Sequence, residues 1–360
     1  MKTRNIVKKF FAFAAAAAMT LSLCACSSGG KTGPGAIDDD KAQAPAQSQQ
    51  DDSNASGDTA EYTFAIIKQM DHASLDEIAN AVAAQLDRLA ADKNVTIHYT
   101  ITSGQNGDQT ILTQLADQAI ADKVDAIIPI ATTAAQIAAV CAEDSKTPVV
   151  YAAISDPEAA ELTGIDYVTG TSDALNTKFI LDMMLAQSPK NISKVGLLYC
   201  LSEANSKAPI AEAKAYLDGK GIAYVEQTAN TNDEVIAAAS SLIAQGVDAI
   251  FTPTDNVIMS AELAIYEDLA AAGIPHYTGA DSFVRNGAFA TCGVNYTELG
   301  ARTADLAYEA VTAGMGGMDD YYLMDGGIIT VNTETAAALG ADYSMFNNMG
   351  TVVEVVTTED

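Results

Sequence analysis

Residues 124–133 read VDAIIPIATT, and residues 247–256 read VDAIFTPTDN. In each string, an apolar run of strand character ends at threonine and passes into a segment with helical spacing. Two further pairs of strings recur in the same order, namely FAII at 64–67 with VGLL at 195–198, and TPVVYAA at 147–153 with IPHYTGA at 274–280. The shared order predicts two lobes of one topology. The alternative is that any two sheets of this kind share strings this short.

Strand-like and helix-like segments alternate from about residue 61 onward. Near-continuous apolar strands separated by helices are typical of parallel sheets with helices on both faces. We therefore predict an α/β protein with two doubly wound parallel-sheet lobes and a hinge, crossed three times by the chain. The expected boundaries are 61–171 plus 293–327 for the first lobe, 172–292 plus 328–345 for the second, and 346–360 for a C-terminal tail.

The first 60 residues differ from the rest of the chain. Basic residues precede an apolar run, and LCAC at 23–26 resembles the lipobox of bacterial lipoproteins. This pattern predicts a signal peptide over 1–25, lipidation at Cys26, and a disordered tether over 26–60. The expected location is the outer face of the bacterial cytoplasmic membrane, with the lipid as anchor. The alternative is an ordinary signal peptide with an incidental cysteine.

Composition and motifs exclude several classes of protein. The net charge of −28 disfavours nucleic acid as a partner, because phosphate backbones are recognised by basic surfaces. The three histidines, at 72, 98 and 276, are scattered and show no metal-ligand spacing. No catalytic motif occurs, neither a nucleophile elbow nor a phosphate-binding glycine loop with lysine. We expect no enzyme, no metal and no cofactor.

Candidate ligand contacts lie in the loops that follow the strands. In open α/β sheets, ligands bind beyond the carboxyl ends of the strands. Residues 202–205, SEAN, follow a strand and open a helix, where free N–H groups favour an anion such as a carboxylate. Simple helix capping by Ser202 or Asn205 is the competing interpretation.

Asp255 sits in an equivalent position in the next loop, and it is expected either to pair with a ligand ammonium or to cap a helix. Asp281 supplies a second carboxylate. In the facing lobe, neutral donors and acceptors are expected, and His72 is expected at the rim. The full set of predicted ligand-binding residues is Asp71, Thr132, Thr133, Gln136, Ser202, Glu203, Ala204, Asn205, Thr254, Asp255, Asn256 and Asp281.

Several strings together resemble the substrate-binding lipoproteins of ABC importers, in the group that binds tryptophan, tyrosine or phenylalanine. They are SDP at 155–157, LSEANS at 201–206, PTDN at 253–256 and GVNYTELG at 293–300. The resemblance covers about residues 62 to 341. It implies a type I periplasmic-binding-protein fold, a monomer that closes around one solute, and delivery to an ABC permease with its ATPase subunit.

The ligand class stays open at this point. This chain reads GADSF at 279–283 where members of the family read Gly-Asp-Ser-Asp, so the shape of the pocket there is expected to differ. The leading hypothesis is an α-amino acid, with its carboxylate on Ser202–Asn205 and its ammonium on Asp255. The alternatives are a sugar or other small-solute receptor of the same fold, and a sensory or signalling lipoprotein.

Overall fold

The structure is a computed structural model that describes residues 59–187 and 192–358. The predicted signal peptide, Cys26 and almost all of the predicted tether lie outside the described residues. Within these two ranges, no helix combines the length and the apolar character needed to cross a membrane.

The first lobe is built on a six-stranded sheet with the order β11-β5-β4-β3-β1-β2, in which every neighbouring pair is parallel. The strands are β1 (Glu61–Lys68), β2 (Thr96–Ser103), β3 (Ala126–Ile130), β4 (Val149–Tyr151), β5 (Val168–Ser172) and β11 (Tyr322–Leu323). The helices are α1 (Ala73–Lys93), α2 (Gln109–Ala121), α3 (Thr132–Cys141) and α10 (Tyr296–Thr312).

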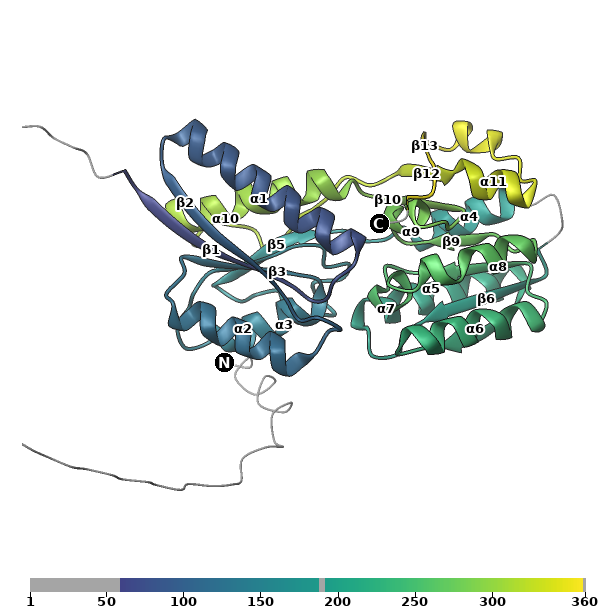
Figure 1. The fold of residues 1–360 in the computed structure, drawn as a ribbon, viewed down its shortest axis with the longest axis horizontal. Coiled ribbons are helices and arrows are strands. Elements are labelled where there is room, and N and C mark those ends of the chain that lie inside the picture. The colour runs from purple at the N-terminus through teal and green to yellow at the C-terminus, as the bar shows by residue number, and fades with distance from the viewer. Residues whose placement is uncertain (1–58, 188–191, 359–360) are drawn as a thin grey trace, which may run out of the picture. The chain divides into compact units, whose positions relative to one another are not determined.

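Both faces of this first sheet are buried, as the apolar strands predict. In β1, Phe64 and Ile66 pack toward α1 and α10, whereas Ala65 and Ile67 pack toward α2 and α3. Figure 1 shows these two helix pairs on opposite faces of the sheet. Successive side chains of a strand point to opposite faces, so a strand covered on both sides must be apolar at nearly every position.

The second lobe is built on a seven-stranded sheet with the order β13-β12-β10-β9-β8-β6-β7. The strands are β6 (Lys194–Tyr199), β7 (Ala223–Thr228), β8 (Ala249–Thr252), β9 (His276–Thr278), β10 (Ala290–Gly293), β12 (Ile328–Asn332) and β13 (Thr351–Val355). The helices are α4 (Thr177–Gln187), α5 (Ala204–Lys220), α6 (Asn232–Ala244), α7 (Asn256–Met259), α8 (Tyr266–Ala271), α9 (Asp281–Arg285) and α11 (Thr333–Leu339), with two 3₁₀ segments, η2 (Glu262–Ala264) and η3 (Ser344–Asn348).

The two sheets share one strand order. The order β2-β1-β3-β4-β5 in the first lobe corresponds to β7-β6-β8-β9-β10 in the second. The chain passes between the sheets after β5, after β10, and between β11 and β12. The predicted fold class, two doubly wound lobes, is therefore confirmed. The exception to parallel pairing is β12, which runs antiparallel to β10 because it enters the second sheet from the other lobe.

One expectation about the C-terminus is wrong. The sequence predicts a tail over residues 346–360, but Thr351–Val355 forms β13, which pairs in parallel with β12 along its whole length. The added strand covers the edge that β12 would otherwise leave unpaired, and an unpaired edge exposes backbone hydrogen-bonding groups. A short strand of mixed exposure carries little sequence signal of its own.

Candidate ligand-binding site

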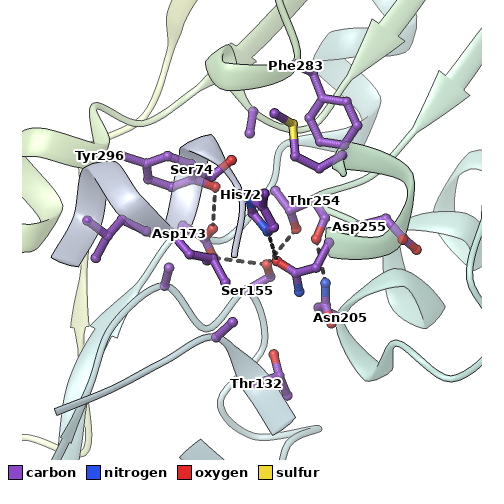
Figure 2. Close-up of a pocket in the computed structure, with 17 residues that line it drawn as sticks. His72, Ser74, Thr132, Ser155, Asp173, Asn205, Thr254, Asp255, Phe283 and Tyr296 are labelled. Atoms are coloured by element: carbon purple, nitrogen blue, oxygen red, sulfur yellow. Dashed lines mark hydrogen bonds between the residues drawn. The ribbon is translucent and has the colours of Figure 1, made fainter. Parts of the chain in front are cut away.

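A pocket lies between the lobes, at the carboxyl ends of strands from both sheets (Figure 2). Its lining combines polar and apolar side chains from segments far apart in the sequence. The lining residues are His72, Ser74, Leu75, Ile78, Ala131, Thr132, Ala153, Ser155, Asp173, Asn205, Thr254, Asp255, Asn256, Met259, Ala280, Phe283 and Tyr296. This is the location that the position of the strand-end loops predicts.

A row of hydrogen-bonded polar groups crosses the pocket from one lobe to the other (Figure 2). Asp173 accepts hydrogen bonds from the hydroxyl of Ser155 at 2.9 Å and from the hydroxyl of Tyr296 at 3.0 Å. Because the Ser155 hydrogen points to Asp173, the Thr254 hydroxyl, 2.9 Å away, donates to Ser155. Asn205 then donates to the carbonyl oxygen of Thr254 at 2.5 Å.

Asp173 is the carboxylate of the pocket that retains acceptor capacity. Two oxygens of a carboxylate offer about four lone-pair positions, and the side-chain donors Ser155 and Tyr296 take one on each oxygen. Asp173 is 5% exposed, and burial raises its pKa above the usual value. A buried carboxylate of this kind is stabilised by a cation that enters with the ligand.

Of the two roles that the sequence allows for Asp255, the structure shows helix capping. Its Oδ1 accepts from the backbone N–H groups of Val257 and Ile258, both at 3.1 Å, so it is the N-cap of α7. Its Oδ2 accepts from the N–H of Cys200 at 2.7 Å and from the hydroxyl of Ser206 at 2.6 Å. All four acceptor positions are thus occupied by protein donors. No acceptor position is left for a ligand ammonium, and Asp255 instead joins the two segments that follow β6 and β8.

Glu203 is also placed differently from the expectation. It is buried, accepts from Gln69 Nε2 at 2.9 Å and from Asn256 Nδ2 at 2.8 Å, and does not line the pocket. Burial, and then the nearby carboxylate of Asp255, raise its pKa. A second carboxylate beside this one would be repelled, so the N-terminus of α5 is a poor site for a ligand carboxylate.

Better anion sites lie at the N-termini of α1 and α3. In the described structure neither N-cap residue, His72 of α1 or Ala131 of α3, bonds its helix with its side chain, and Ser74, Leu75 and Thr132 from the first turns line the pocket. In α3, Gln69 Oε1 takes the N–H of Thr133, so the N–H of Thr132 is the donor that faces the pocket lining. By contrast, α2 and α6, whose first residues do not line the pocket, are capped by Asp108 and Thr231. Uncapped N–H groups and the helix dipole favour a carboxylate.

The backbone at the strand ends is also unusual. Ala131 and Ala153 both line the pocket with positive φ values of 76° and 59°. Gly279 packs against the next loop so closely that a Cβ there would lie 2.4 Å from the backbone nitrogen of Thr254. Strained residues of this kind cluster at sites where the chain must present a particular surface.

Part of the lining is apolar. It is supplied by Leu75, Ile78, Met259, Ala280 and Phe283, and Figure 2 shows Phe283 on the far side of the pocket from Thr132. A pocket that combines a polar row with apolar side chains fits a ligand with a charged end and a hydrophobic body.

The remaining predicted residues lie around the pocket without lining it. Asp71 is exposed and pairs with Lys68 at 2.7 Å. Thr133 donates its N–H to Gln69, Gln136 donates to the carbonyl oxygen of Ala160, and Ser202 is exposed beside Cys200. Ala204 begins α5 next to Glu203 and is absent from the lining. Of the predicted set, Thr132, Asn205, Thr254, Asp255 and Asn256 line the pocket.

Asp281 belongs to an ion-pair network that joins the lobes. Its Oδ2 accepts from Arg285 at 2.5 Å, and Arg285 also pairs with Glu77 of the facing lobe. Glu77 in turn accepts from the hydroxyl of Thr297 at 2.8 Å. Together with the Ser74–Ser282 hydroxyl pair, these contacts hold the two lobes against each other in the structure.

Sequence reasoning missed Ser74, Ser155, Asp173 and Tyr296 as pocket residues, and it placed His72 at the rim. Ser155 lies in a strand-end loop, which was the available signal. Asp173 directly follows β5 and Tyr296 begins α10, so both lie where the chain crosses between lobes. Crossing segments border the cleft, and their polar residues are therefore candidates in their own right.

The chain is similar to several known binding proteins. The chain is 29% identical over 303 residues to the tyrosine-binding protein of Clostridioides difficile (strain R20291), covering 81% of this chain and 86% of that protein. Among solved structures, it is similar to an ABC domain from Streptococcus pneumonia in complex with L-Trp, with a TM-score of 0.73 and 26% identity over 82% of this chain and 100% of the other.

A ligand-free, open substrate-binding protein with adhesive properties from Clostridium difficile gives a TM-score of 0.61 at 28% identity, over 82% of this chain and 100% of the other. Its TM-score is lower than that of the L-Trp complex although its sequence identity is higher. This difference agrees with lobes that are open in that structure and in contact in this one. The neighbouring structures are type I periplasmic binding proteins. The tyrosine-binding protein and the substrate-binding protein named above are binding proteins rather than enzymes, in agreement with the lack of catalytic motifs in the sequence.

The family model described as "ABC transporter substrate binding protein" matches residues 63–344, which includes every residue that lines the pocket and all strands except β13 and the first two residues of β1. With this fold, this cleft and this match, the chain belongs to the substrate-binding proteins of ABC transporters.

Proposed function

We propose that this protein captures one α-amino acid with an aromatic side chain and delivers it to an ABC permease. The observation that carries the proposal is Asp173, a buried carboxylate with free acceptor positions in a pocket whose other end is apolar. A ligand that satisfies both ends carries a cation on a hydrophobic body.

The three parts of such a ligand find separate partners. The α-ammonium pairs with Asp173, which burial makes costly to leave ionised without a cation. The α-carboxylate accepts from the N-terminal turns of α1 and α3, where Ser74 and Thr132 lie. The aromatic ring packs against Ile78, Met259 and Phe283. Sulfur–aromatic and ring–ring contacts favour a flat side chain there.

The relatives support this assignment of ligand class. One of them is named as a tyrosine-binding protein, and another was solved with L-Trp. A sugar receptor of the same fold is the second candidate. Sugar sites are commonly built on stacked aromatic rings, and this chain contains no tryptophan.

The mode of capture is hinge closure. The chain crosses between the lobes at three places, and direct contacts join the rims of the cleft on either side of the pocket. Closure of this type is a standard response of two-lobed binding proteins to their ligands. We further propose that residues 1–25 are a signal peptide and that Cys26 carries the lipid anchor, so a monomeric receptor works at the outer face of the cytoplasmic membrane.

A thermal-shift panel of amino acids, sugars and nucleosides tests the ligand class. A ligand present at 100 times its Kd stabilises the folded protein by about 2.7 kcal/mol. We expect aromatic amino acids to raise Tm and sugars and nucleosides to leave it unchanged. A shift with sugars alone would contradict the proposal.

Transport is tested separately from binding. Uptake of the labelled amino acid by cells that lack this gene should fall, and it should be restored by the gene on a plasmid. Normal uptake in the deletion strain, together with tight binding in vitro, would favour the sensory alternative.

A further inference from the structure

A chain of hydrogen bonds crosses the cleft twice and fixes the orientation of each side chain in it. The N–H of Thr133 donates to Gln69 Oε1 at 2.8 Å, so the other end of this amide, Nε2, donates to Glu203 Oε1 at 2.9 Å. Glu203 Oε2 accepts from Asn256 Nδ2 at 2.8 Å. Oδ1 of Asn256 therefore faces Nε2 of His72, 3.0 Å away.

This geometry determines the state of the His72 ring. An amide oxygen only accepts hydrogen bonds, so His72 Nε2 must carry the hydrogen and donate to Asn256. The ring is neutral, because burial lowers the pKa of His72 to about 4. In a neutral imidazole with hydrogen on Nε2, the other nitrogen, Nδ1, is a bare acceptor.

The bare nitrogen is buried without a partner. His72 Nδ1 is fully covered and makes no hydrogen bond with any described residue, and His72 lines the pocket. Asn205 is similar, because its Nδ2 donates to Thr254 and leaves Oδ1 buried without a described partner. Buried acceptors of this kind are rare in folded proteins and cost free energy until a donor arrives.

We propose that His72 Nδ1 is a specificity-determining acceptor, which selects aromatic amino acids with an O–H or N–H donor on the ring over those without one. The proposal rests on the proposed function and deepens it. In the proposed function, the ligand ammonium pairs with Asp173, which belongs to the separate polar row with Ser155 and Tyr296 (Figure 2). His72 is instead held by Asn256 and, through it, by Glu203.

The size of the selection follows from the cost of an unpaired acceptor. A ligand such as phenylalanine excludes water from the pocket but brings no donor for His72 Nδ1. Leaving a buried acceptor unpaired lowers affinity by about 5- to 150-fold relative to a ligand that pairs with it. Sites built to bind a ring hydroxyl reject the analogue that lacks it for this reason.

The test is calorimetric titration of the full chain with L-tyrosine, L-tryptophan and L-phenylalanine. In the wild type, tyrosine or tryptophan should bind at least about fivefold more tightly than phenylalanine. In His72→Phe, which keeps a flat ring and removes the acceptor, this ratio should fall to about one while phenylalanine binds as well as before or better. Asp173→Asn is the matched control, since it should weaken all three ligands by a similar factor.

A second measurement does not depend on any variant folding. The chain has three histidines, so ¹⁵N spectra of histidine-labelled protein can be assigned with single substitutions at His98 and His276. With phenylalanine bound, His72 should show a protonated Nε2 and an unprotonated Nδ1, and the Nδ1 signal should move when a donor-bearing ligand replaces phenylalanine.

Three results would overturn the inference. They are equal affinity of the wild type for all three ligands, uniform weakening of all three by His72→Phe, and a hydrogen on Nδ1 in the spectrum. Uniform weakening of all three ligands would indicate that His72 Nδ1 accepts a hydrogen bond from the ligand ammonium. Failure of the wild type to bind any of the three would instead refute the proposed function itself.

Discussion

Asp173→Asn is the substitution that isolates the charge on which ligand binding is proposed to depend. Asparagine keeps the shape of the side chain, and its oxygen still accepts from Ser155 or Tyr296, which donate at 2.9 and 3.0 Å in the wild type. The other hydroxyl can rotate to accept from the new amide. The protein therefore loses one negative charge and little else.

The expected effect on binding is large. Removing one partner of a buried ion pair costs about 3–5 kcal/mol. At about 1.4 kcal/mol per tenfold change, affinity should fall by roughly two to three and a half decades. Because burial raises the pKa of Asp173, its charge is unfavourable in the absence of ligand, so the ligand-free Tm of Asp173→Asn should be unchanged or slightly higher.

Asp255→Asn is the matched comparison. It should lower the stability of the ligand-free protein, whereas Asp173→Asn should lower the affinity for the ligand. Asp255 is fully buried and accepts four hydrogen bonds, two on each oxygen. Asparagine offers one acceptor oxygen, which can serve the N–H groups of Val257 and Ile258. The Ser206 hydroxyl can turn to accept from the new NH₂ group, but the N–H of Cys200 loses its partner. The free energy of unfolding should fall by about 1–3 kcal/mol, the cost of one unsatisfied buried donor.

Calorimetric titration with tyrosine and tryptophan, combined with urea unfolding of the ligand-free proteins, separates these outcomes. Wild-type binding by Asp173→Asn would refute the ammonium assignment. A loss of several kcal/mol of ligand-free stability in this variant would show that Asp173 is structural. A stable Asp255→Asn protein that fails to bind would return the ammonium to Asp255.

Three further predictions concern pH, closure and anchoring. In the structure, burial lowers the pKa of His72 from 6.5 to about 4. We expect His72 to gain this burial on closure and to release its proton, so that binding weakens as pH falls below 6.5. At about pH 5.5, the wild type should lose about tenfold in tyrosine affinity relative to His72→Phe, and this comparison cancels the opposite effect of Glu203. An unchanged affinity ratio between pH 7.5 and 5.5 would contradict this. Glu77→Gln removes the partner of Arg285 across the cleft and should raise the ligand dissociation rate about two- to fivefold in stopped-flow fluorescence; an unchanged rate would show that the pair does not hold the cleft closed. Cys26→Ala should release the protein into the medium or leave unprocessed precursor, as mass spectrometry of the N-terminus would show; wild-type protein free of lipid would refute the anchor.

The fold was predictable because its signal repeats along the chain. Residues 124–133 and 247–256 contain equivalent strands, β3 and β8, which occupy the same place in their sheets. Strands buried on both faces must be apolar throughout, so they are visible in the sequence one at a time. The edge strand β13 is partly exposed and lacks this signal.

The site was only partly predictable, because its residues meet across long stretches of chain. Asp173 is 18 residues from Ser155 and 123 residues from Tyr296, and no local motif joins them. The position of Asp255 in the sequence is compatible with capping a helix and with binding a ligand. The structure distinguishes the two roles, because four protein donors bond its carboxylate. Glu203 opens a helix that attracts anions, yet its own buried carboxylate excludes them.

A crystal structure of the protein grown with L-tyrosine tests the central claim most directly. The account predicts the amino acid between the lobes, with its ammonium within about 3 Å of the Asp173 carboxylate and its ring against Met259 and Phe283. The phenolic hydroxyl should be directed toward Nδ1 of His72. An amino group bound at Asp281 or Asp255, or a tyrosine found outside the cleft, would contradict the account.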